Sequence, residues 1–387
     1  MSDDAFFLSG LKDINLQKLI ILTIIFKLAI ILIIICAYFE LPFNFEYYTY
    51  NFVYPSDEKF NVFSGFKTWD GQHYLSIAEN GYPSGVTSNT AFYPLYPALI
   101  RGIGFFFLGN TLLSGILISN IFSILAIIYF YLFVKKMYDD KIAFTASILM
   151  ISFITFFYTS VVYSEALFIL LVIAFFYYFY EKKFYTCLLL SILIPLARPT
   201  GILVILPVIA YLFLERWNNK NVKETKSSFL ILGFISGFLI YLGVMNYFTG
   251  SFFSGFYAQN LFIANNSLSN LIDPVSWVYK NFINIQYTFN GFTTSILNRI
   301  IFGFYLVLLY YIYKNLDTTL FVYSLALGLI PALTGNFMSY SRFILVVFPI
   351  FIVLALKFQK NSYLLIIPFF GIQILLLISH SLNYWVA

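Results

Sequence analysis

Long apolar stretches that recur from one end of this chain to the other constrain its fold most. A helix needs about 20 apolar residues to cross the hydrocarbon core of a bilayer. Only 10% of the residues are charged, whereas a soluble domain has about 25%. The sequence therefore predicts an all-α polytopic membrane protein with about 10–11 transmembrane helices, at residues 16–39, 111–134, 142–158, 164–180, 184–197, 201–214, 228–248, 299–313, 318–333, 343–356 and 363–381.

The fifth and sixth of these stretches are short and meet at Ala197-Arg198-Pro199-Thr200. Proline disfavours the helical conformation of the residue before it. Two interpretations stay open at this point, namely two separate helices or one broken helix.

The distribution of lysine and arginine predicts the orientation of the chain. With a cytoplasmic N-terminus, 14 basic residues fall on the cytoplasmic side and 7 on the other, while Lys27 lies within the first span. This bias follows the positive-inside rule. Residues 1–18 then form a short cytoplasmic tail before an uncleaved first helix. We expect one integral domain over residues 1–387 in the cell membrane, with two long extracytoplasmic loops at 40–110 and 249–298.

Short cytoplasmic loops exclude several classes of protein. The longest, at about 215–227, has no room for a nucleotide-binding domain, and the chain has no glycine-rich phosphate-binding loop. An ATP-driven pump or an enzyme that uses a cytoplasmic nucleotide sugar is therefore not expected. The net charge of +5 fits anionic lipid headgroups and does not suggest nucleic acid. Cys36 and Cys187 lie in apolar stretches and form no zinc-ligand spacing, so we expect no metal and no cofactor.

The first extracytoplasmic loop contains the densest group of polar side chains, between residues 66 and 101. Trp69-Asp70-Gly71 opens a predicted short helix at 72–80, which Gly81 can end. We interpret Asp70 as a candidate general base. The alternative is that Asp70 only caps the helix, since aspartate is a preferred N-cap residue.

Three residues after Asp70, His73 falls on the same face of the predicted helix. It either orients Asp70, contacts a substrate, or is an ordinary hydrogen-bonding histidine. Further along, Tyr93 and Tyr96 belong to a rigid aromatic and proline segment that either lines a groove for a lipid or sugar or forms an interfacial aromatic belt.

An acidic residue and most of the arginines fall at the extracytoplasmic ends of the predicted spans. Glu165 begins the fourth span, where it is either functional or a favourable charge at a helix N-terminus. Arginine binds phosphate in a bidentate manner, and this group of arginines hints at a phosphate ligand, with snorkelling at helix ends as the alternative. Four of the five arginines are extracytoplasmic: Arg101, Arg198, Arg299 and Arg342.

These residue types fit sugar transfer from a polyprenyl phosphate. An inverting displacement needs one base for the acceptor hydroxyl and cations for the departing phosphate. Asp70 supplies the first requirement, and Arg198 and Arg342 supply the second. The two histidines are far apart and no acids pair at metal-ligand spacing, so this chemistry is expected to proceed without a metal.

The segments TWDGQHYLSIAENGY, AFYPLYPALIR, SVVYSEALF, ARPTG and YSRF, in that order, resemble the PIG-V family of GT-C mannosyltransferases. The similarity spans roughly residues 66–349. It implies a GT-C fold, a dolichyl- or polyprenyl-phosphate-mannose donor and an extracytoplasmic active site. The resemblance assigns the base to Asp70 and a phosphate contact to Arg198, with a looser match at Arg342.

The acceptor implied by this interpretation is a lipid or a glycan, and a partner subunit is possible. Substrate-binding candidates are His73, Arg198, Arg342, Glu165, Tyr93, Tyr96 and Arg101. Two alternatives stay open: a flippase or transporter of lipid-linked sugars, and a non-catalytic subunit on a GT-C scaffold. A transporter requires charged residues within a span, and Lys27 is the strongest such candidate.

Overall fold

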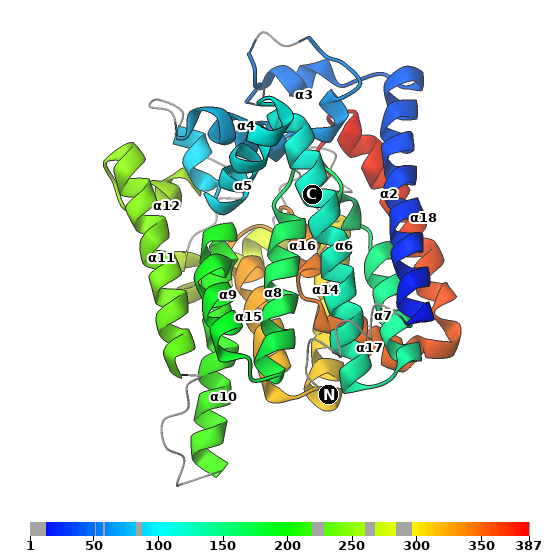
Figure 1. The fold of residues 1–387 in the computed structure, drawn as a ribbon, viewed down its shortest axis with the longest axis vertical. Helices are drawn as coiled ribbons and strands as arrows, with labels where there is room; N and C mark the ends of the chain where they lie inside the picture. Colours follow the sequence, from blue (N-terminus) through cyan, green and yellow to red (C-terminus); the bar gives the residue numbers. More distant parts are fainter. Residues whose placement is uncertain are drawn as a thin grey trace.

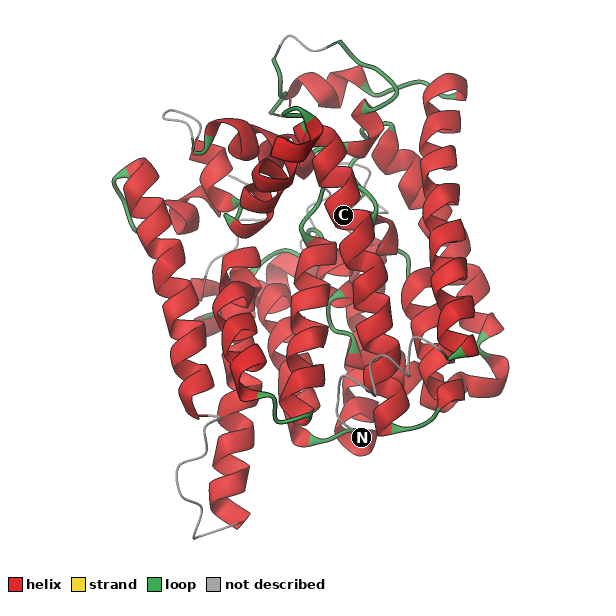
Figure 2. Ribbon diagram, viewed as in Figure 1, coloured by secondary structure: helices red, strands yellow, loops and turns green. Residues whose placement is uncertain are grey.

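The computed structural model describes residues 13–50, 52–56, 59–82, 87–218, 228–259, 268–283 and 296–386. Most of the predicted N-terminal tail and parts of the loops at 215–227 and 249–298 lie outside the described residues. Within the described ranges the chain is helical and has no strand (Figure 2). This confirms the all-α class.

Long helices run side by side as a bundle, and short helices cover one end of it (Figure 1). The short helices α3 (Phe45–Tyr50), α4 (Asp70–Asn80) and α5 (Leu95–Gly104) come from the first long loop, and we call these helices and the described chain that connects them the cap. The bundle contains α2 (Ile14–Glu40), α6 (Thr111–Met137), α7 (Asp140–Ser152), α8 (Glu165–Tyr180), α9 (Phe184–Ala197), α10 (Ile205–Asn218), α11 (Ser228–Thr249), α14 (Leu297–Asn315), α15 (Thr318–Thr334), α17 (Pro349–Phe358) and α18 (Tyr363–Ser381).

The second long loop contributes a short helix, α12 (Ser254–Gln259), at the same end of the bundle as the cap (Figure 1). The Thr90 hydroxyl donates to the Ser254 carbonyl oxygen at 3.3 Å, which joins α12 to the cap. The two loops that the sequence predicted on one side of the membrane therefore lie together.

By length and composition, five helices among the described residues are able to cross a membrane. The protein is thus a polytopic membrane protein. Other predicted spans form helices that are shorter than 20 residues, such as α8 with 16 residues and α9 with 14. The five long apolar helices are Ile14–Glu40, Thr111–Met137, Pro199–Trp217, Ser228–Thr249 and Tyr363–Ser381.

The predicted span at 142–158 was too long, because α7 ends at Ser152. An irregular segment follows at residues 153–164, which includes one turn of 3₁₀ helix, η4 (Phe156–Thr159). A polar side chain from another helix donates hydrogen bonds to backbone carbonyl groups at the end of α7. Gln373 of α18 donates to the carbonyl oxygens of Ile151 and Phe153. Such distant partners end a helix without any local stop signal.

The predicted span at 343–356 is divided into α16 (Tyr340–Leu345) and α17. Pro349 causes the division, since proline lacks a backbone N–H and is accommodated in the first turn of a helix. At the other open position, α9 ends at Ala197 and Arg198 is extended. A 3₁₀ turn, η5 (Pro199–Val204), then leads into α10. The chain therefore forms two helices there.

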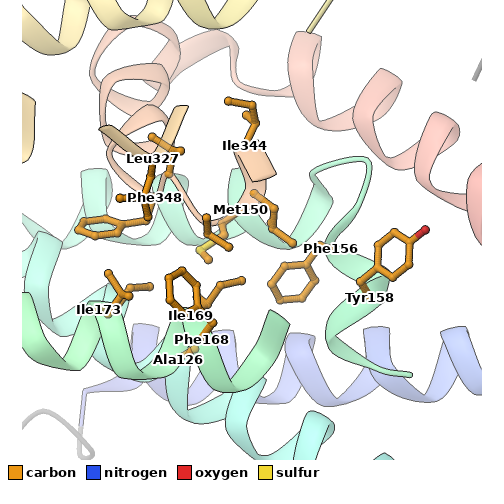
Figure 3. Packing of buried hydrophobic residues seen from close by; sticks show 14 of the residues in the cluster. Ala126, Met150, Phe156, Tyr158, Phe168, Ile169, Ile173, Leu327, Ile344 and Phe348 are labelled. Carbon is orange, nitrogen blue, oxygen red and sulfur yellow. The ribbon is translucent and has the colours of Figure 1, made fainter. Parts of the chain in front are cut away.

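The irregular segment 153–164 is packed into the hydrophobic core of the bundle (Figure 3). Phe156 and Tyr158 of this segment are buried with Phe168 of α8 and Ile344 of α16. Helices from distant parts of the sequence therefore meet around an irregular stretch of chain. This packing fixes the residues at the start of α8, where the candidate site begins.

Candidate active site

Four charged side chains from separate parts of the chain meet where the cap contacts the bundle, and we call them the ion cluster. Asp70 is the first residue of α4, Glu165 is the first residue of α8, Arg198 follows α9, and Arg342 lies in α16. The Arg342 Nη2 lies 2.9 Å from Asp70 Oδ2 and 2.7 Å from Glu165 Oε1. Its Nε donates to the same Glu165 oxygen at 2.9 Å. The Arg198 Nη1 lies 2.8 Å from that oxygen.

The members of the ion cluster differ in how far they reach the surface. The Glu165 side chain is 0% exposed, Arg342 is 5% exposed and Arg198 is 10% exposed. A buried charge is tolerated when it is paired, and the two guanidinium groups provide that pairing for Glu165. The Asp70 side chain is 20% exposed. Asp70 is therefore the acid of the cluster that a molecule from outside is able to reach.

Two tyrosine rings enclose the Arg342 guanidinium. Its Cζ lies 4.7 Å from the ring centroid of Tyr158 and 4.8 Å from that of Tyr163. Cations are attracted to aromatic faces at such distances. Both tyrosines belong to the irregular segment 153–164, so the early end of α7 brings them to the arginine.

Asp70 does not occupy the capping position of α4. Trp69 lies there with a φ of 57° and a ψ of −116°, and it makes no side-chain capping hydrogen bond. The Asp70 carboxylate instead accepts a hydrogen bond from Arg342. Gly71 allows close packing at this point, because a Cβ atom there would lie 3.2 Å from the Val162 carbonyl oxygen.

His73 lies in the same helix but faces the interior of the cap. Its ring is stacked between those of Phe52 and Phe92, each at 4.5 Å. Its Nδ1 lies 2.6 Å from Asn89 Oδ1, so the neutral ring donates that hydrogen bond. Burial lowers the pKa of His73, while the Asn89 hydrogen bond and the Asp70 charge act in the opposite direction.

Three predicted substrate-binding residues lie apart from the ion cluster. Tyr93 is buried and stacks on Tyr241 of α11 at 4.1 Å. The Tyr96 hydroxyl pairs with Ser119 Oγ at 2.7 Å, which fastens α5 to α6. Arg101 is exposed, and its Nη1 donates to the Glu79 carbonyl oxygen at 3.4 Å. These contacts join the cap to the bundle or lie on the surface of the cap.

Sequence reasoning missed Tyr158 and Tyr163. The signal for Tyr163 was its place two residues before Glu165 in the segment SVVYSEALF. Nothing in the local sequence distinguished Tyr158 from the other tyrosines in apolar stretches. Among the described residues, no three His, Cys, Asp or Glu side chains gather as a potential metal site.

Parts of the chain are similar to known mannosyltransferases. Residues 93–241 match the Dolichyl-phosphate-mannose-protein mannosyltransferase family. That region contains Glu165 and Arg198, while Asp70 and Arg342 lie outside it. A stretch of 40 residues is 48% identical to GPI mannosyltransferase 2 of Drosophila melanogaster, which covers 10% of this chain and 8% of that protein. Both similarities support the resemblance to PIG-V-like mannosyltransferases.

Proposed function

We propose that this protein is a membrane mannosyltransferase that uses Asp70 as its general base. It moves mannose, or a related hexose, from a polyprenyl- or dolichyl-phosphate donor to a lipid or glycan acceptor. The observation that carries the proposal is the ion cluster. The partly exposed Asp70 carboxylate pairs with Arg342, and the buried Glu165 carboxylate pairs with both Arg342 and Arg198. The similarity to mannosyltransferases supports the sugar and the lipid-linked donor.

The proposed reaction is a single inverting displacement. The acceptor hydroxyl attacks the anomeric carbon of the donor and gives its proton to Asp70. The bond between that carbon and the phosphate oxygen breaks, and its electron pair leaves with the polyprenyl phosphate. Because phosphate departs without strong protonation, one base and nearby cations meet the requirements of the step.

Within this reaction the arginines stabilise the phosphate. A guanidinium group has five N–H donors, and the ion pair of Arg198 with Glu165 involves its Nη1. The other N–H groups of Arg198 are proposed to bind the phosphate group of the sugar donor. Glu165 was grouped with the substrate-binding residues on sequence grounds. Since its side chain is fully buried, we assign it the role of counter-ion that holds both guanidinium groups in place.

The proposed orientation places the ion cluster on the extracytoplasmic side of the cell membrane, with a cytoplasmic N-terminus and one domain over the whole chain. The predicted bias of basic residues supports it. The position of α12 beside the cap also supports it, because both long loops then lie on one side.

The contacts of Lys27 do not favour the transporter alternative. Lys27 is 4% exposed, and its ammonium donates to the Thr159 carbonyl, the Thr159 hydroxyl and the Ser160 hydroxyl. These three bonds account for a charge within a span without a transport path. The alternative of a non-catalytic subunit predicts no sugar transfer by the protein on its own.

Turnover by purified Asp70→Asn protein tests the proposal. The donor is polyprenyl-phosphate-mannose labelled in the sugar, and the acceptor pool is the extracted lipid of the source membrane. We expect kcat to fall by on the order of 10²–10⁴-fold, with KM changed little, because proton transfer is lost and binding is kept. Asp273→Asn is the matched control, since the Asp273 carboxylate caps α13 (Pro274–Val278) through the backbone N–H of Ser276 and is not a member of the ion cluster. Normal turnover by folded Asp70→Asn protein would rule out Asp70 as the base.

A further inference from the structure

The backbone just before Asp70 adopts an unfavourable conformation. Trp69 has a φ of 57°, and a residue with a Cβ atom in such a region costs on the order of 1–3 kcal/mol. Strain of this kind persists where the surroundings fix it. The contacts that hold this turn therefore decide where the Asp70 carboxylate points.

One hydroxyl group joins the two residues on either side of Trp69. The Tyr163 hydroxyl donates to the Thr68 carbonyl oxygen at 3.0 Å. The Tyr163 hydroxyl oxygen in turn accepts a hydrogen bond from the backbone N–H of Asp70 at 3.3 Å. Tyr163 is fully buried, so water does not replace these bonds. The hydroxyl thus bridges the strained residue.

A backbone hydrogen bond joins the same two stretches of chain, and a residue of α18 contacts one of them. The backbone N–H of Val162 donates to the Phe66 carbonyl oxygen at 3.0 Å. From α18, His380 Nε2 lies 2.9 Å from the Thr68 hydroxyl oxygen. The segment that leads into Glu165 is therefore bound to the segment that leads into Asp70, and the Tyr163 hydroxyl is the contact nearest to Asp70.

The aromatic ring of Tyr163 contacts the partner of Asp70. The Arg342 guanidinium lies 4.8 Å from the ring centroid, and that guanidinium donates to Asp70 Oδ2. A single side chain therefore contacts the backbone of Asp70 through its oxygen and the cation bonded to Asp70 through its ring. Its position sets the geometry of the pair.

We propose that Tyr163 is a positioning residue for the sugar-transfer reaction, an inference that rests on the proposed role of Asp70 as base. The Tyr163 hydroxyl holds the Trp69 turn so that one oxygen of Asp70 meets Arg342 and the other is presented to the acceptor hydroxyl. Tyr163 itself does not touch the substrate. The contacts to Thr68 and Asp70 carry the proposal.

The variant Tyr163→Phe removes the hydroxyl and keeps the ring against Arg342. We expect kcat to fall on the order of tenfold to a hundredfold, because misplacement of a catalytic group by about 1 Å has effects of that size. KM for polyprenyl-phosphate-mannose should change less than about twofold. The control is Tyr305→Phe, which removes a buried hydroxyl that donates to the Ser324 carbonyl oxygen at 2.7 Å between α14 and α15. The control should keep its kcat with a similar loss of thermal stability.

Hydrogen exchange gives a second measurement that does not depend on activity. Peptides that cover residues 66–72 should exchange faster in Tyr163→Phe than in the wild type and at the wild-type rate in Tyr305→Phe. Unchanged exchange, or wild-type kcat in Tyr163→Phe, would overturn the positioning role. An active Asp70→Asn enzyme would overturn the proposed function instead, and the exchange measurement would still decide whether the hydroxyl holds the turn.

Discussion

Two buried cationic centres adjoin the irregular segment 153–164, and they satisfy their charges in different ways. At the first, Arg342 and Arg198 are paired with the carboxylates of Asp70 and Glu165. At the second, the Lys27 ammonium is bonded to neutral oxygens of Thr159 and Ser160 at 2.6–3.0 Å. The ion cluster and the Lys27 centre are thus two solutions to the burial of positive charge.

The difference lies in the bonding capacity that remains. An ammonium group has three donors, and three oxygens occupy the donors of Lys27. In the ion cluster, the Asp70 side chain is 20% exposed. An ionised carboxylate has about four acceptor sites for hydrogen bonds, so Asp70 keeps acceptor sites beyond its bond to Arg342. Burial of a charge within a span is therefore a weak sign of function, and unused acceptor capacity at an accessible atom is a stronger one.

The largest effect should separate the two acids of the ion cluster. Glu165→Gln leaves Arg198 and Arg342 without their buried counter-ion, which costs about 3–5 kcal/mol. Asp70→Asn removes a partly exposed charge and should leave the melting temperature nearly unchanged while kcat falls by on the order of 10²–10⁴-fold. Thermal unfolding of the two purified variants in one detergent measures the contrast. Equal destabilisation by both substitutions would contradict the division between counter-ion and base.

A smaller effect is expected at the Lys27 centre. Lys27→Met removes the charge and leaves the hydroxyls of Thr159 and Ser160 without their donor, which should cost about 1–3 kcal/mol. Turnover per folded molecule should stay within about twofold of the wild-type value, because the Lys27 ammonium is buried and its three donors are all used. Lys18→Met, at an exposed position of the same helix, is the stability control. A large fall in kcat for Lys27→Met with an unchanged melting temperature would show that the two centres are coupled in function.

The smallest effect concerns pH. Because burial lowers the pKa of His73, the folded protein binds fewer protons at this site than the unfolded chain does below about pH 6.5. The contribution of His73 to stability is therefore constant above that pH and declines as the pH falls further. The melting temperature of the wild type should drop more steeply between pH 6.5 and 5 than that of His73→Gln. Parallel curves would show that His73 titrates normally.

Much of the fold followed from local sequence signals. The apolar stretches predicted the long helices, and the proline after Arg198 marked a real helix boundary. The early end of α7 was beyond such reasoning, because Gln373 of a distant helix satisfies the backbone there. The division at Pro349 was predictable from proline chemistry, but the apolar composition on both sides concealed it.

The candidate site was only partly predictable. Asp70, Arg198 and Arg342 were recognisable as charges at the ends of spans. The bond between Asp70 and Arg342 joins residues 272 positions apart, and sequence periodicity does not report contacts at that range. The bridging hydroxyl of Tyr163 depends on the backbone of Trp69, which is a three-dimensional property. Whether Asp70 acts as the base stays a prediction.

The position of Arg342 near the end of the chain has a consequence for biosynthesis. A chain that has been synthesised only through α10 contains Asp70, Glu165 and Arg198 but not the Arg342 guanidinium that links the two acids. Until α16 emerges, Glu165 has one of its two arginine partners, and an underpaired buried carboxylate is unfavourable. The ion cluster is therefore complete only after α16 has been synthesised, which makes this late helix necessary for full pairing of the buried Glu165 carboxylate.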